Sequence, residues 1–119
     1  MEFTIEFYET RAGRSPVQEF LDELKTSDPD DFAAVLAGIV KLKNRKYHQP
    51  PLSKSIGDAL FELRHVGKLN TRLLYFFMKN RRIIIAHGIR SKAIKISTRH
   101  RIVALERKRD WLERYQDET

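Results

Sequence analysis

The stretch FELRHVGKLNTRLLYFFMKNRRIIIAH, residues 61–87, decides the fold because it contains three β-rich runs joined by two short turns. The runs cover residues 61–64, 71–78 and 82–87 and are rich in β-branched, aromatic and other large apolar side chains. The two segments between them carry the glycine and asparagine residues that hairpin turns favour. The stretch therefore predicts an antiparallel meander of three strands.

One strand and two helices are predicted ahead of the meander. Residues 1–8 alternate apolar and polar side chains, which is the period of a strand with one buried face. Ser15 and Pro16 form a helix-start signal, and apolar residues follow at helical spacing until about Thr26. A second start signal at residues 27–29 begins another amphipathic helix. The two helices should form a helical hairpin.

The remaining segments complete the expected order of elements. Residues 43–58 lack periodicity and contain Pro50-Pro51, so we expect an irregular, exposed connection there. Ser97 or Thr98 can cap a last amphipathic helix. The order β-α-α-β-β-β-α predicts an α+β fold, in which an antiparallel twisted sheet packs against helices mainly on one side. The length predicts a single domain over residues 1–119.

Positive charge is concentrated in the middle of the chain. Residues 1–40 contain nine acidic and three basic side chains, whereas residues 41–100 contain 15 lysines and arginines against only Asp58 and Glu62. The last 19 residues are balanced, so the net charge of +7 comes entirely from the middle segment. Such a distribution is typical of a protein that binds a phosphate backbone, although solvated helix faces can also be basic.

Several classes of protein are disfavoured by what the sequence lacks. The absence of cysteine excludes disulfides and thiolate metal sites, and it favours a reducing compartment. No signal-peptide pattern and no apolar stretch of membrane-spanning length is present, so we expect a cytoplasmic protein. The histidines, His48, His65, His87 and His100, are too widely spaced to suggest a zinc site. Without a carboxylate cluster, a glycine-rich phosphate loop or a nucleophilic serine elbow, we expect neither a metal ion nor a cofactor.

Two arginines of the meander are the strongest candidates for binding phosphate. If residues 67–69 form a three-residue hairpin loop, Arg64 and Arg72 face each other across two strands, which is repulsive unless an anion lies between them. The alternative is that both arginines pair with the N-terminal acids or with Glu62. We expect Arg72, at a strand end, to make few core contacts, so that its replacement by alanine would abolish activity without unfolding the protein.

RNA is a suitable substrate for a basic protein without metal ligands, because its own 2′-hydroxyl can attack the neighbouring phosphorus. The protein then has to supply charge stabilisation and proton transfer. His87 and His100 are candidates for the acid or base, and either of them can instead be structural.

The ordered segments of the chain resemble a known family. SPVQEFL at 15–21, PLSK at 51–54, LFELR at 60–64, TRLLYFF at 71–77 and HGI at 87–89 are similar to the HigB-like, phage-derived branch of the RelE/ParE superfamily of toxins. The resemblance spans nearly the whole chain. It implies a compact α+β toxin that cleaves messenger RNA, usually in the ribosomal A site, and that a small antitoxin neutralises.

The resemblance also implies which residues form the site. Arg72 corresponds to the recurrent phosphate-binding arginine of the family, Arg64 to the arginine that ends the Glu-Leu-Arg strand, and Lys92 to a basic residue after the His-Gly turn. Lys54 corresponds to the lysine of the Pro-Leu-x-Lys segment. Ser91-Lys92 and Ile96-Ser97 depart from the paired lysines and the Thr-Pro that are common in this branch. The expected catalytic residues are Arg64, Arg72, Lys92 and His100, the last by position only, and the expected RNA-binding residues are Lys54, Arg90 and Lys95.

The function expected from the resemblance is that of a metal-independent, ribosome-dependent endoribonuclease of a type II toxin–antitoxin system. Its partners would be a cognate antitoxin, encoded nearby, and messenger RNA on the ribosome. A ParE-like toxin that binds DNA gyrase is the alternative, and a non-catalytic RNA-binding module is a third possibility. The basic residues Arg64, Arg72 and Lys92 favour the nuclease.

Overall fold

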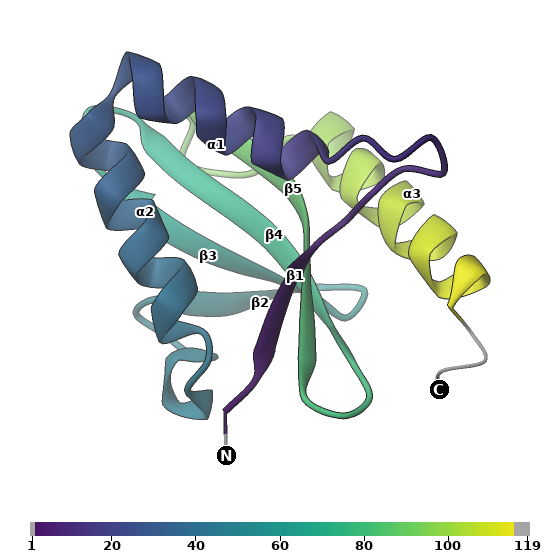
Figure 1. Ribbon diagram of the computed structural model, residues 1–119. Coiled ribbons are helices and arrows are strands. Elements are labelled where there is room, and N and C mark those ends of the chain that lie inside the picture. The colour runs from purple at the N-terminus through teal and green to yellow at the C-terminus, as the bar shows by residue number, and fades with distance from the viewer. Residues whose placement is uncertain (1, 116–119) are drawn as a thin grey trace.

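The computed structural model describes residues 2–115 as five strands in one sheet with helices on both faces (Figure 1). The strand order is β1-β5-β4-β3-β2, so the meander β3-β4-β5 forms the centre of the sheet. The strands are β1 (Thr4–Phe7), β2 (Ser53–Gly57), β3 (Leu60–Val66), β4 (Asn70–Met78) and β5 (Arg82–Ser91). The helices are α1 (Pro16–Ser27), α2 (Pro29–Lys41) and α3 (Thr98–Arg114), with a short 3-10 turn at Arg45–Tyr47. The α+β fold predicted from the sequence is confirmed.

The turns of the meander set its register as predicted. Val66 pairs with Asn70, so residues 67–69 form a three-residue loop and Arg64 lies directly opposite Arg72. Between β4 and β5, Asn80 and Arg81 adopt positive φ angles of 65° and 55°. Met78 pairs with Arg82, so residues 79–81 form a second three-residue loop, in which these two positive φ angles turn the chain back.

Two details of the sheet differ from the expectation. The segment 43–58 is not irregular throughout, because β2 pairs antiparallel with β3. Its sequence, SKSIG, does not alternate between apolar and polar residues, because this edge strand is held by backbone hydrogen bonds and not by the burial of one face. The sheet is also mixed rather than wholly antiparallel, because β1 pairs parallel with β5.

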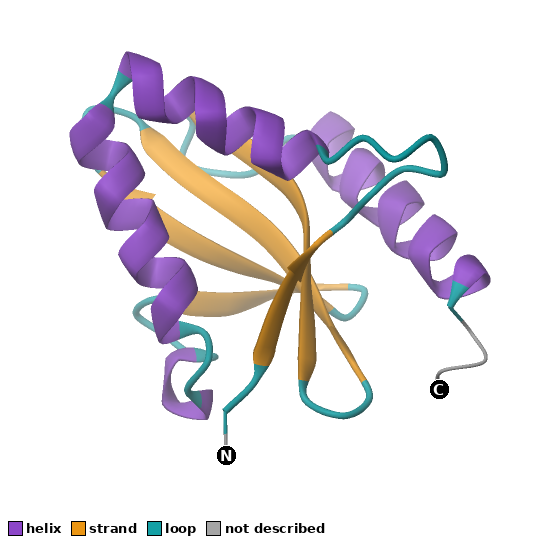
Figure 2. Ribbon diagram, viewed as in Figure 1, coloured by secondary structure: helices purple, strands orange, loops and turns teal. Residues whose placement is uncertain are grey.

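The helices divide between the two faces of the sheet, which corrects the expectation that they pack mainly on one side (Figure 2). Helices α1 and α2 bury Val17, Leu21 and Val35 against one face. Helix α3 buries Ala104 and Trp111 against the other face, which we call the α3 face. Sequence periodicity predicts that a helix buries a stripe but does not reveal which side of a sheet the stripe contacts.

A β-bulge determines which side chains of β5 reach the α3 face. Tyr75 pairs with Ile85 but Leu74 pairs with His87, so Ala86 is an extra residue in β5. Strict alternation would place residues 84, 86, 88 and 90 on one face. Because the bulge shifts this alternation by one residue, His87 and Ile89 lie on the α3 face and Arg90 lies on the opposite one.

Candidate functional site

The candidate site lies on the α3 face, where the strand register aligns polar side chains in two rows. Lys54 pairs with Glu62, Glu62 with Leu74, and Leu74 with His87, which forms one row across β2 to β5. Arg64, Arg72 and Ile89 form the next row. Paired residues point to the same face of a sheet, so both rows share the α3 face.

Arg72 is buried beneath this face rather than exposed on it. Its side chain is only 1% exposed, and its Nε donates a 2.8 Å hydrogen bond to Oε1 of Glu62. Its NH2 donates to the carbonyl oxygens of Ala93 and Ile94, at 2.9 and 2.6 Å, in the loop between β5 and α3. The expectation that Arg72 makes few core contacts is therefore wrong. Arg72 holds a buried carboxylate and the loop together.

Glu62 is the carboxylate that the alternative interpretation of the two arginines named as a partner, and it does pair with Arg72. Its side chain is 2% exposed, and Oε2 lies 3.9 Å from Nζ of Lys54 while Oε1 accepts the bond from Arg72. A buried carboxylate requires such partners. The sequence offered two signals for this residue. Glu62 lies in an otherwise apolar strand, and it is one of only two acids in a segment with 15 basic residues.

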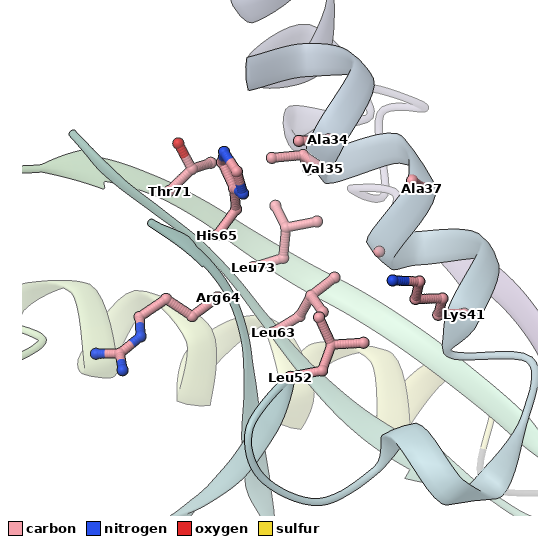
Figure 3. Close-up of a pocket in the computed structure, with 11 residues that line it drawn as sticks. Ala34, Val35, Ala37, Lys41, Leu52, Leu63, Arg64, His65, Thr71 and Leu73 are labelled. Carbon is pink, nitrogen blue, oxygen red and sulfur yellow. The ribbon is translucent and has the colours of Figure 1, made fainter. Parts of the chain in front are cut away.

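Arg64 is the predicted arginine that remains available for a ligand. It is half-buried, and Figure 3 shows its side chain on the other side of β3 from Leu63, Leu73 and helix α2. Among residues 2–115, no carboxylate lies within ion-pair distance of its guanidinium. Lys54 is 57% exposed on the neighbouring strand. The two cations therefore give the α3 face an exposed positive charge.

The predicted residues of the β5–α3 loop and of the start of α3 lie over the same face of the sheet, because the loop binds Arg72 and His100 contacts His87. Lys92 and Lys95 are exposed in the loop whose carbonyl groups bind Arg72. His100 lies in the first turn of α3, where its backbone N–H donates to the capping Oγ of Ser97. We call Lys54, Arg64, Lys92, Lys95 and His100 the basic site.

His87 and His100 form a pair that Arg107 extends. Nε2 of His87 lies 2.9 Å from Nδ1 of His100, and Nδ1 of His87 lies 3.1 Å from NH1 of Arg107. The same NH1 donates a 2.9 Å bond to the carbonyl of Ala86. Burial, reinforced by the positive charge of Arg107 and by His100, lowers the pKa of His87 to about 4. His87 is therefore neutral at pH 7.

The lowered pKa of His87 predicts a loss of stability in acid. The unfolded chain takes up a proton at this residue near pH 6.5, whereas the folded protein does so only near pH 4, so stability falls as the pH decreases through that interval. We expect the free energy of unfolding to fall by on the order of 2 kcal/mol. This is less than the full effect of the pKa shift, because the ring is partly exposed and solvent screens it. Urea denaturation at pH 7 and pH 4.5 should show a smaller decrease for His87→Gln than for the wild type. Equal decreases would contradict the assignment.

Arg90 does not join the basic site, which corrects its grouping with Lys54 and Lys95. Because of the bulge, it lies on the α1 and α2 side, where NH2 contacts Asp28 at 2.5 Å and Asp31 at 3.1 Å. Asp31 also accepts bonds from His65 and Thr71. This network attaches the start of α2 to the sheet, so the charge of Arg90 is neutralised within the protein.

An apolar groove lies on the side of β3 away from the basic site. Helix α2 and strands β3 and β4 enclose about 300 Å³ there, lined by Val35, Leu63 and Leu73, with Lys41 at one end and His65 at the other (Figure 3). Its lining is mostly apolar, and of its ionisable side chains, Lys41, Arg64 and His65, the last is engaged by the carboxylate of Asp31. The basic site is therefore the better candidate for chemistry on an anionic ligand.

Within residues 2–115, none of the helices combines the length and the apolar character that crossing a membrane requires. No curated protein matches the sequence. The family described as phage derived protein Gp49-like (DUF891) matches residues 19–109, which include most of α1, all of α2, the four strands β2 to β5 and most of α3. Because this match covers well over half of the sequence, the chain belongs to the Gp49-like family of phage-derived, toxin-like proteins.

Proposed function

We propose that the protein is a metal-independent endoribonuclease of the HigB-like type, the toxin of a type II toxin–antitoxin pair that cleaves messenger RNA on the ribosome. The observation that carries the proposal is the unpaired guanidinium of Arg64 beside exposed Lys54, on the same sheet face as the His87–His100 pair. Membership of a toxin-like family supports it. A protein-binding toxin has no need for an unpaired arginine on the same sheet face as a pair of imidazoles.

The proposed chemistry uses the RNA itself as the nucleophile. The 2′-hydroxyl attacks the adjacent phosphorus while its proton passes to water, the bond to the 5′-oxygen breaks, and this oxygen takes a proton from water, so the products are a 2′,3′-cyclic phosphate and a 5′-hydroxyl. Arg64 and Lys54 stabilise the charge that develops on the phosphoryl oxygens. His87 takes no part in proton transfer, because both of its ring nitrogens are occupied by Arg107 and His100.

The test is to add the purified protein to translating ribosomes and to map new RNA 5′ ends. We expect new ends inside open reading frames with the wild-type protein and far fewer with Arg64→Ala. Inhibition of DNA gyrase without new ends would instead establish the ParE-like alternative. Binding of RNA without cleavage would establish a non-catalytic module.

We also propose that a small antitoxin with an acidic segment binds across the basic site. Such a segment can neutralise a surface that has few acids of its own, and electrostatic interfaces weaken as salt screens the charges. Between about 50 and 500 mM salt, the affinity for the protein encoded beside the toxin gene should fall by roughly tenfold or more. Titration calorimetry measures this fall, and the Lys54→Ala/Arg64→Ala double variant should show a shallower one. A salt-independent affinity would argue against this interface.

A further inference from the structure

The hydrogen bonds around His87 determine which ring nitrogens carry protons. The guanidinium of Arg107 can only donate, so Nδ1 of His87, 3.1 Å from NH1, must accept. Neutral His87 therefore carries its proton on Nε2, which faces Nδ1 of His100 at 2.9 Å. Nδ1 of His100 must then accept in turn, and the proton of neutral His100 lies on Nε2.

The Nε2 atom of His100 is the end of this chain that reaches the surface. It has no hydrogen-bond partner within residues 2–115, and it is not one of the buried polar atoms that lack a partner there. Ser97 fixes the backbone of His100 in the first turn of α3, and His87 fixes the ring from below. His100 thus contributes an oriented N–H group to the basic site.

We propose that Arg107 is a positioning residue which, acting through His87, makes His100 present its Nε2–H as a hydrogen-bond donor to a phosphate oxygen of bound RNA. The inference rests on the proposed function for its ligand, and it deepens that function by assigning His100 as a donor rather than a general base. Arg107 itself does not touch the ligand. Its NH1 is occupied by the carbonyl of Ala86 and by His87, and its guanidinium packs over the ring of Tyr8.

This arrangement explains why an arginine is placed under a histidine pair. With an acceptor such as a carboxylate at the position of Arg107, the proton of His87 would lie on Nδ1, and Nδ1 of His100 would have to donate. Nε2 of His100 would then be a bare lone pair, which suits a general base and repels a phosphate oxygen. The donor-only guanidinium selects the opposite tautomer.

The test combines spectroscopy of the imidazoles with binding of an RNA that cannot be cut. Long-range proton–nitrogen NMR spectra at pH 7 should show both His87 and His100 protonated on Nε2 in the wild-type protein. In Arg107→Met, the fraction protonated on Nδ1 should rise in both rings. Arg107→Lys retains a donor-only side chain and should largely retain the wild-type tautomers. Arg109→Met removes the same charge from an exposed position of α3 and should leave both rings unchanged.

Binding of a single-stranded 2′-O-methyl oligoribonucleotide tests the ligand, because its blocked 2′-oxygen prevents cleavage. Addition of this oligonucleotide should shift the Nε2–H resonance of His100. The affinity should fall about fivefold in Arg107→Met, the size expected for one hydrogen bond, and remain near the wild-type value in Arg109→Met.

The outcomes separate this inference from the proposed function. The wild-type tautomers together with a shifted His100 resonance support the positioning role, even if the protein cuts no RNA on ribosomes. A proton on Nδ1 of His100 in the wild-type protein would overturn the inference, even if RNA is cut. An oligonucleotide that binds without moving the Nε2–H resonance would overturn the donor role.

Discussion

Arg72→Met should lose about 3–5 kcal/mol of the free energy of unfolding, the effect of removing one partner from a buried ion pair. Glu62 would keep its buried carboxylate with only Lys54 nearby, at 3.9 Å, and the carbonyl groups of Ala93 and Ile94 would lose their donor. Urea denaturation measures the loss. Because domains of this size are stable by only about 5–15 kcal/mol, the variant is expected to unfold readily at growth temperature.

The double variant Glu62→Leu/Arg72→Met provides the control for this prediction. Replacing both charges by apolar side chains removes the unpaired carboxylate, so its stability should return to within about 1–2 kcal/mol of the wild type. A single variant as stable as the wild type would show that the ion pair does not support the fold. Loss of toxicity in an Arg72 variant would therefore not by itself identify a catalytic arginine.

Arg64→Ala should lower the rate of RNA cleavage about a hundredfold, as expected when one preorganised charge on the reacting phosphate is lost, roughly 3 kcal/mol. The side chain is unpaired among the described residues and half-buried, so stability should change by no more than about 1 kcal/mol. Arg64→Lys should restore little, because an ammonium group cannot form the two parallel bonds of a guanidinium. Single-turnover cleavage of ribosome-bound message measures the rate.

Lys79→Ala is the matched control for Arg64→Ala. Lys79 is exposed in the β4–β5 turn, at the opposite end of the sheet from the 67–69 loop, and its replacement removes the same unit of charge. It should cleave at nearly the wild-type rate. If both variants cleave equally, whether slowly or fast, Arg64 has no special place in the reaction.

The fold was predictable where short-range chemistry determines it. The residues of the 67–69 loop were sufficient to place Arg64 opposite Arg72, and Ser15-Pro16 and Ser27-Asp28-Pro29 marked both helix starts. Strand β2 was missed because an edge strand with exposed lysine and serine residues has no apolar period to detect. The side on which α3 packs was missed because an amphipathic pattern shows that one side of a helix is buried but not which face of the sheet that side covers.

The site was predictable in composition but not in geometry. Alternation along β4 places Arg72 with Leu74 and Phe76, two fully buried residues, so the sequence contained a signal that Arg72 faces the core. The sheet face on which Arg90 lies depends on the bulge at Ala86, and the sequence of β5 contains no pattern that predicts this bulge. The role of Arg107 required a contact between α3 and β5 that arises only in the tertiary structure.

The parallel pairing of β1 with β5 has a consequence for the order of folding. Thr4 pairs with Arg82, so β1 cannot pair until β5 has been synthesised, and closing so long a loop costs entropy before any contact compensates for it. The hairpins β3–β4 and β4–β5 each close over three residues and can form first. A nascent chain that stops before β5 leaves β1 without its partner strand and the sheet with an open edge. Formation of the basic site is thus delayed until β5 and α3 have both left the ribosome.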